Sequence, residues 1–273
     1  MRLLPTERAR VNILGVGVDA VDMRSAALAI DAAVSGGRKG YVCVTGVHGI
    51  MEAQRDERLK AILNHSLLTT PDGMPTVWLG RWYGFDRMHR VYGPDLMLEV
   101  CALSARKGYT HFLYGGKPGV AEQLRSVLQF RFPGIKILGA YCPPFRPLDQ
   151  AEQRRLVSVV ASLRPDLFWV GLSTPKQERF MAQFLGELNI KVMLGVGAAF
   201  DIHAGLVQDS PRWVKAAGLQ WLHRLYQEPG RLWKRYLRNN PEFMLKVSLQ
   251  LAGLRSYPIP AGGERQQPLS RIA

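Results

Sequence analysis

One isolated carboxylate, Asp72, lies in the segment TTPDGMP (residues 69–75), directly after the apolar pair Leu67-Leu68. The segment falls where a short buried strand is expected to give way to a helix. A lone carboxylate without a cluster of metal ligands suits a general base that removes a proton from a hydroxyl group. An Asp between Pro and Gly is also typical of a turn or a helix N-cap, so these alternatives stay open on this segment alone.

Further polar or glycine-rich segments follow other expected strands or precede expected helices. The segment VTGVH ends one strand with a hydroxyl and an imidazole, and YGGKPG combines glycines with a lysine before a helix. Glycines let the backbone approach a ligand closely, and the free N–H groups of a helix start attract phosphate, although an ordinary strand-to-helix turn is the alternative. Together with HRVYGPD, VGLSTPKQE and GVGAAFD, these corners supply the candidate ligand-binding residues Thr45, His48, Arg90, Gly115, Gly116, Lys117, Gln177, Glu178 and Asp201.

Two common nucleotide-binding motifs are missing from the sequence. The pair Gly195-x-Gly197 is followed by Phe200, where a dinucleotide loop needs Gly or Ala, and Gly15-x-Gly17 precedes no convincing helix start. No GxxxxGK[ST] segment is present either. These features disfavour P-loop hydrolysis and a nicotinamide-dependent sugar dehydrogenase, which is kept as an alternative function.

The pattern along the first two hundred residues predicts an α/β fold. Short apolar runs alternate with segments whose apolar residues recur at helical spacing, which is typical of a mostly parallel sheet covered by helices on both faces. Ligands of such sheets bind beyond the carboxyl ends of the strands. Strands are expected at 11–18, 41–46, 66–70, 110–116, 135–141, 166–172 and 191–200, and helices at 23–35, 121–132, 149–163 and 175–188.

A basic segment follows. The formal net charge of +14 is least neutralised at 211–246, where eight Lys/Arg meet two acids. This segment predicts three short helices, broken at 228–230 and 240–241. The middle helix places Arg231, Lys234, Arg235 and Arg238 on one side, with Leu232, Trp233, Tyr236 and Leu237 opposite. A solvated basic face is the simpler interpretation, but the lack of interleaved acids favours a surface that meets an anion or a membrane.

Composition sets the remaining expectations. We expect a main domain at 1–209, a basic helical appendage at 210–255 and a disordered tail at 256–273, which is rich in Pro, Gly and Gln. The three scattered cysteines indicate no disulfide framework and no metal site, so a reducing, cytoplasmic setting is expected. We expect no signal peptide, because acidic and basic residues precede the first apolar run, and no membrane-spanning helix, because no apolar run is long enough.

Six segments, in this order over roughly residues 11–245, resemble a family of bacterial glycosyltransferases. They are TPDGMP, RVYGPDL, FLYGGKPG, VGLSTPKQE, GVGAAFDIHAG and WLHRLYQEPGRLWKRYL. The family includes the teichoic-acid and enterobacterial common antigen transferases of N-acetylmannosamine and its uronic acid, and the xanthan glucosyltransferase. The resemblance implies a Rossmann-like domain that uses a UDP-sugar donor, inverts the anomeric carbon and needs no metal or other cofactor. It further implies a sugar acceptor on a polyprenyl diphosphate and an appendage that docks on the inner face of the cytoplasmic membrane.

The same resemblance assigns roles to individual residues. Asp72 matches the proposed general base, and Arg90 and Gln177 match residues of the substrate pocket. Arg224, Arg231 and Lys234 match basic residues that meet a diphosphate, although a lysine lacks the bidentate geometry of a guanidinium. One position departs from the family: the Asn that often follows Thr45 by two residues is Val47 here, unless His48 takes its role.

Other functions and partners remain open at this stage. A nucleic-acid-binding protein would also be basic, with Trp and Tyr beside Arg, but the sequence contains no recognisable nucleic-acid module. We therefore expect a UDP-sugar, a lipid-linked acceptor and an anionic membrane surface as partners, and no nucleic acid. The donor sugar, the acceptor sugar and a possible homo-oligomer are left undetermined.

Overall fold

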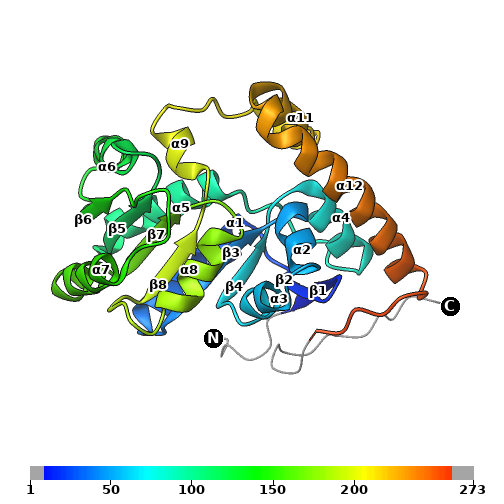
Figure 1. Ribbon diagram of the computed structural model, residues 1–273, viewed down its shortest axis with the longest axis horizontal. Helices are drawn as coiled ribbons and strands as arrows, with labels where there is room; N and C mark the ends of the chain where they lie inside the picture. The colour runs from blue at the N-terminus through cyan, green and yellow to red at the C-terminus, as the bar shows by residue number, and fades with distance from the viewer. Residues whose placement is uncertain (1–8, 260–273) are drawn as a thin grey trace.

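The computed structural model describes residues 9–259, apart from the side chains of Arg212, Ala216 and Arg231. A six-stranded sheet lies at its centre in the order β4-β3-β8-β7-β5-β6, with helices on both faces (Figure 1). All neighbouring strands in this sheet are parallel, which confirms the predicted α/β class. The strands are β3 (Gly40–Thr45), β4 (Leu68–Pro71), β5 (Thr110–Gly115), β6 (Lys136–Tyr141), β7 (Leu167–Gly171) and β8 (Val192–Gly195).

Apolar side chains alternate between the two faces of the sheet and build two cores. In β7, for example, Phe168 and Val170 join one buried cluster while Leu167 and Trp169 join the other. This alternation follows from the two-residue period of a strand. One core packs under α1 (Met23–Ser35), α5 (Gly93–Lys107), α6 (Val120–Arg131) and α9 (Ala199–His203), and the other under α2 (Val47–Ala53), α3 (Glu57–Asn64), α4 (Met74–Trp82), α7 (Gln150–Leu163) and α8 (Lys176–Phe184).

The expected strand at 11–18 is wrong as a single element. The segment instead forms an antiparallel hairpin of β1 (Arg10–Ile13) and β2 (Val16–Asp19), separate from the main sheet. Leu14 and Gly15 connect the strands with φ of 54° and 79°. Two successive residues of positive φ give a turn whose twist matches a hairpin. The sequence did not show this turn, because nearly every residue of both strands is buried and no change of pattern marks the point between them.

The C-terminal helices are α10 (Arg212–Ala216), α11 (Gln220–Gln227) and α12 (Pro229–Leu251). The predicted break at 240–241 is wrong, because α12 continues through Pro241. Proline removes one intrahelical hydrogen bond, a cost that tertiary packing on both sides of the site can offset. Asn239, Phe243 and Val247 are buried around it. The first predicted helix also divides in two, at Gly218, whose φ is +72°.

The buried stripe of α12 differs from the predicted apolar side. Leu232 is buried as expected, but Trp233 and Leu237 are exposed. The stripe instead joins Leu232 to the three buried residues that surround Pro241. The helix lies against α2 along the side of the main body (Figure 1), and it covers the carboxyl-end region of β3 and β4.

The far end of α12 is tied to the hairpin. The Gln250 side chain accepts a hydrogen bond from Leu14 N and donates one to Asn12 O. Asn12 also donates to the carbonyl oxygen of Tyr257, so residues just past the helix lie against the hairpin. The remainder of the tail expected at 256–273 lies outside the described residues from 260 onward. No helix in the described ranges is long and apolar enough to cross a membrane.

Candidate active site

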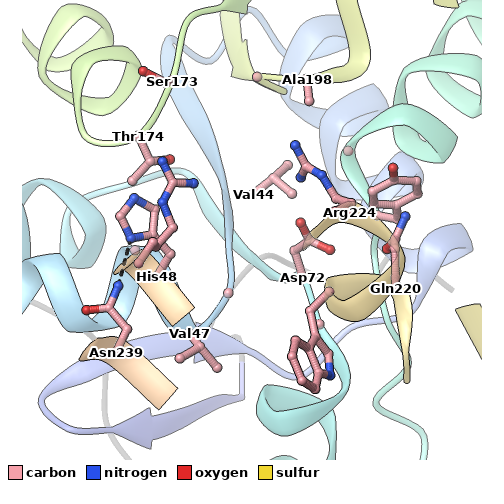
Figure 2. A pocket seen from close by; sticks show the side chains of 18 of the residues that line it. Val44, Val47, His48, Asp72, Ser173, Thr174, Ala198, Gln220, Arg224 and Asn239 are labelled. Carbon is pink, nitrogen blue, oxygen red and sulfur yellow. Dashed lines mark hydrogen bonds between the residues drawn. The ribbon is translucent and has the colours of Figure 1, made fainter. Parts of the chain in front are cut away.

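A cavity of about 480 Å³ opens beyond the carboxyl ends of β3, β4, β7 and β8. Its floor is made by strand-end residues, and its cover is made by α11 and α12. Figure 2 shows Asp72, Gln220 and Arg224 at one end, and His48, Thr174 and Asn239 at the other. This position agrees with the rule that ligands bind beyond the carboxyl ends of parallel strands.

Asp72 follows β4 directly and is held by the neighbouring strand. Its N–H donates to the carbonyl oxygen of Thr45 at the end of β3, at 2.9 Å. Gly46 passes so closely that a Cβ there would overlap the carbonyl oxygen of Asp72. The N-cap of α4 is Gly73, with φ of 105° and no side-chain cap bond. Asp72 is therefore not a helix cap, which removes one of the alternatives raised by the sequence.

The Asp72 carboxylate instead meets Arg90. Both Nε and Nη2 of Arg90 donate to the same oxygen, Oδ1, at 3.2 and 3.1 Å. No described residue hydrogen-bonds the other oxygen, Oδ2, and about 30% of the Asp72 side chain is exposed. The guanidinium of Arg90 also lies 4.4 Å from the ring centre of Tyr92 and donates to Oε1 of Gln220. One carboxylate oxygen is thus fixed while the other stays accessible.

His48 lies at the opposite end of the cavity, in the first turn of α2. Its Nδ1 is 3.1 Å from the side-chain nitrogen of Asn239, while Oδ1 of Asn239 accepts from Arg55. The amide orientation makes Nδ1 the acceptor, so the network assigns the His48 proton to Nε2. Burial and the nearby Arg235 charge lower the pKa of His48 from 6.5 to about 4. His48 is therefore neutral around pH 7.

Gln177 and Glu178 form a small polar floor beside β7. Oε1 of Glu178 accepts from the Thr174 hydroxyl at 2.9 Å and from the Gln177 amide at 3.0 Å. Glu178 is almost fully buried, and this burial raises its pKa. Gln177 Oε1 has no hydrogen-bond partner among the described atoms. Gln177 is buried, and this residue contributes to the lining of the cavity.

The structure brings six of the candidate residues together around the cavity. They are His48, Asp72, Arg90, Gln177, Asp201 and Arg224. Two others support them from beneath, since Thr45 holds the backbone of Asp72 and Glu178 holds Gln177.

The other candidates lie elsewhere. Gly115 ends β5, Gly116 and Lys117 follow it, and none of the three lines the cavity. Gly116 N donates to Gly171 O, so this glycine turn packs against the neighbouring strand end. Lys234 is exposed, with its Nζ 5.6 Å from the Trp233 ring centre. The side chain of Arg231 lies outside the described part of the structure.

Sequence reasoning missed several residues that the C-terminal helices bring to the cavity. Gln220 binds Arg90 and Asn239 binds His48, as described above. Asn239 lies four residues after Arg235, and this spacing places both on one side of α12. This spacing was visible in the sequence, since both residues precede the predicted break at 240–241. The missed lining residues of these helices are Gln220, Trp221, Arg235, Tyr236, Asn239, Asn240, Phe243 and Met244.

Metal ligation has no candidate cluster in the described part of the chain. Within residues 9–259, no group of three or more His, Cys, Asp or Glu side chains is arranged to hold a metal ion. The charged groups at the cavity are instead the Asp72–Arg90 pair and the lining residues Asp201, Arg224, Glu228 and Arg235.

The class of enzyme follows from the match between this chain and a known family. The family model described as "Glycosyl transferase WecG/TagA/CpsF family" matches residues 11–257. The chain therefore belongs to this family and is a glycosyltransferase. Among its relatives is the N-acetylglucosaminyldiphosphoundecaprenol N-acetyl-beta-D-mannosaminyltransferase of Bacillus subtilis (strain 168), 30% identical over 217 residues, which cover 79% of this chain and 82% of the relative. The protein of the same description from Bacillus spizizenii is 30% identical over 210 residues, covering 77% and 79%.

Proposed function

We propose that this glycosyltransferase moves a sugar from a UDP-sugar to a hydroxyl group of a sugar carried on a polyprenyl diphosphate. The two Bacillus relatives are described as acting on an N-acetylglucosaminyl diphosphoundecaprenol acceptor, which supports an acceptor of this class. Such acceptors serve the synthesis of cell-envelope polysaccharides. The cavity of about 480 Å³, which is lined by charged and polar residues, is of the size that holds small-molecule ligands.

Asp72 is the proposed general base, and its geometry is the observation that carries the proposal. One carboxylate oxygen is held by Arg90, and the other has no hydrogen bond from any described residue. This free oxygen removes the proton of the acceptor hydroxyl while the hydroxyl oxygen attacks C1 of the donor sugar. The bond from C1 to the phosphate oxygen breaks, its electron pair leaves with UDP, and the configuration at C1 inverts.

Positive side chains offset the charge that grows on the departing diphosphate. Arg224 and Arg235 line the cavity from α11 and α12 and are the cations proposed for this role, in place of a metal ion. Preorganised cations stabilise developing charge strongly because they need no reorganisation during the reaction. The family resemblance assigned a diphosphate contact to Lys234, but Lys234 does not line the cavity. We propose Arg235 for this contact instead.

The C-terminal helices are also the proposed membrane-docking surface. Four apolar or aromatic side chains are exposed on them, namely Trp213, Tyr226, Trp233 and Leu237. The basic residues Lys234 and Arg238 are exposed on α12 as well. Aromatic rings at a membrane interface and basic side chains near anionic lipids both favour peripheral binding. Docking on the cytoplasmic face would bring the cavity to the level of the lipid diphosphate.

Replacing Asp72 with Asn tests the proposal at nearly constant volume. The protein is incubated with a panel of UDP-sugars and a lipid-diphosphate acceptor analogue, and product is separated by chromatography. Asp72→Asn should lower kcat by about 100-fold or more, because the amide cannot accept the proton. Stabilisation of the variant by UDP in a thermal-shift assay should persist. The exposed Asp86→Asn variant is the matched control and should turn over normally.

Comparable turnover by the Asp72→Asn enzyme would contradict the assignment of the base. Absence of transfer by the unchanged protein from every UDP-sugar in the panel, together with no stabilisation by UDP, would contradict the proposed donor class.

A further inference from the structure

Gln220, at the start of α11, contacts Arg90 in the main domain. Its Oε1 accepts a hydrogen bond from Nη2 of Arg90, the same nitrogen that donates to Asp72. Gln220 is 7% exposed and lines the cavity beside this pair. Of the groups found to hold the Arg90 guanidinium, Asp72 and Tyr92 belong to the main domain, and Gln220 alone belongs to the described C-terminal helices.

The orientation of the Gln220 amide is set from the other side by Asp209. Nε2 of Gln220 lies 3.4 Å from Oδ1 of Asp209. A carboxylate accepts hydrogen bonds and does not donate them, so the amide must turn its NH₂ toward Asp209. Its oxygen then faces Arg90. Both ends of the amide are therefore committed to protein partners.

Asp209 is itself fixed by three further contacts. Its Oδ1 accepts from the hydroxyl of Tyr92 at 3.1 Å and from the backbone N–H of Ser210, and its Oδ2 is 2.5 Å from Nζ of Lys215. Lys215 also lies 4.8 Å from the Tyr92 ring centre, on which Arg90 rests. The cluster is a closed polar network in which each member restrains the next.

We infer that Gln220 is a positioning residue for the Asp72–Arg90 pair, through which the placement of α11 controls the geometry of the proposed base. This inference rests on the proposed function. Arg90 can turn its guanidinium toward or away from Asp72, and Gln220 favours the orientation in which two N–H groups meet Oδ1. If α11 moves away, Arg90 loses this restraint.

Replacement of Gln220 by Leu removes both hydrogen bonds at similar volume. The expected result is a loss of about tenfold or more in kcat, with KM for the donor changed by less than about threefold, because substrate contacts remain while the reacting group is misplaced. Gln227→Ala is the matched control. Gln227 ends the same helix and donates to Gln208 O, away from the cavity, so both constants should stay within about twofold.

A double-mutant cycle separates positioning from a general loss of structure. Arg90→Lys removes the guanidinium that Gln220 binds. When it is present, the further change Gln220→Leu should reduce kcat by less than about twofold, because coupled residues are non-additive. The inference would be overturned if the fold-loss in kcat of the double variant equalled the product of the two single losses. Normal kcat in Gln220→Leu would also overturn it. Gln220→Asn is the alternative variant if Gln220→Leu fails to fold, because it keeps the amide group on a shorter side chain. Its kcat should fall while KM for the donor is preserved. Normal kcat in Gln220→Asn would count equally against a positioning role for Gln220.

A second measurement does not depend on turnover. In protein labelled with ¹⁵N at arginine, exchange of the Arg90 Nε–H with solvent should be faster in Gln220→Leu than in the unchanged protein or Gln227→Ala. Equal exchange rates would overturn the inference even if no sugar is transferred. The unchanged protein could fail to transfer any sugar and still show slow Arg90 exchange that becomes faster in Gln220→Leu. That result would refute the proposed function, but it would support the restraint of Arg90 by Gln220.

Discussion

Asn239 in α12 donates a hydrogen bond to Nδ1 of His48 in α2, and so joins the C-terminal helices to the rim of the cavity. Arg55 fixes the Asn239 amide and also pairs with Glu52 and Glu242. The result is a chain of polar contacts from α12 through Asn239 to an imidazole that lines the site. Because His48 accepts in this chain, its neutral form is the one the structure favours.

Protein stability should therefore depend on pH through His48. The folded pKa of about 4 lies below the ordinary 6.5. Between these values the unfolded chain binds more protons, so the contribution of His48 to the free energy of unfolding is complete above about pH 6.5 and is lost as pH falls toward 4. On moving from about pH 7.5 to 5, unchanged protein should lose about 1–2 kcal/mol more than His48→Asn, measured by urea unfolding.

The other histidines of lowered pKa, His111 and His203, are present in both proteins and cancel in this comparison. An equal loss in the two proteins would show that His48 is protonated as easily in the folded chain as in the unfolded one.

Asn239→Asp should raise the pKa of His48 by about one unit or more, because a carboxylate beside the imidazole favours its charged form. Titration of the histidine signals by NMR measures this shift directly. Asn240→Asp is the matched control, since it adds the same charge one residue later, on a different side of the helix. A similar rise in both variants would mean that charge alone, and not the hydrogen bond, controls His48.

Gly46→Ala should displace Asp72, the proposed base, through its backbone. A Cβ at this position would overlap the carbonyl oxygen of Asp72, so the backbone of the β4–α4 corner must shift. We expect a loss of about 1–3 kcal/mol in stability and of about tenfold or more in kcat. Gly186→Ala, where an added Cβ meets open space, is the control for urea unfolding and turnover and should change neither. Normal kcat in Gly46→Ala would mean that the corner relaxes without moving the carboxylate.

Membrane binding should depend on the exposed apolar residues of the C-terminal helices. The double variant Tyr226→Ser with Leu237→Ser removes two such side chains, neither of which lines the cavity. Its sedimentation with anionic phospholipid vesicles should fall by about threefold or more, since each buried apolar group contributes to partition. Phe130→Ser with Phe145→Ser is the control, since it removes two highly exposed rings in α6 and in the segment after β6. Both α6 and β6 lie away from α11 and α12 (Figure 1). Equal losses in both variants would contradict a docking surface located on the C-terminal helices.

The amino-acid sequence by itself determined the α/β class and the elements that local patterns encode. The helix at 23–35 has the predicted bounds, because a capping box between Asp22 and Ser25 and a regular apolar stripe define it locally. The Asp72 corner was also visible, since Pro71 and Gly73 flank it where an apolar strand ends. Family resemblance, carried by six short segments, led to the sugar-transfer chemistry.

Tertiary structure alone decided how the cavity is covered and which partners its residues have. The turn at Leu14-Gly15 and the passage of α12 through Pro241 both oppose local preference, and long-range packing settles them. The contacts of Gln220 with Arg90 and of Asn239 with His48 join residues 130 and 191 positions apart. Such pairs leave no periodic signal in a single chain, because their formation depends on how whole helices dock and not on neighbouring residues.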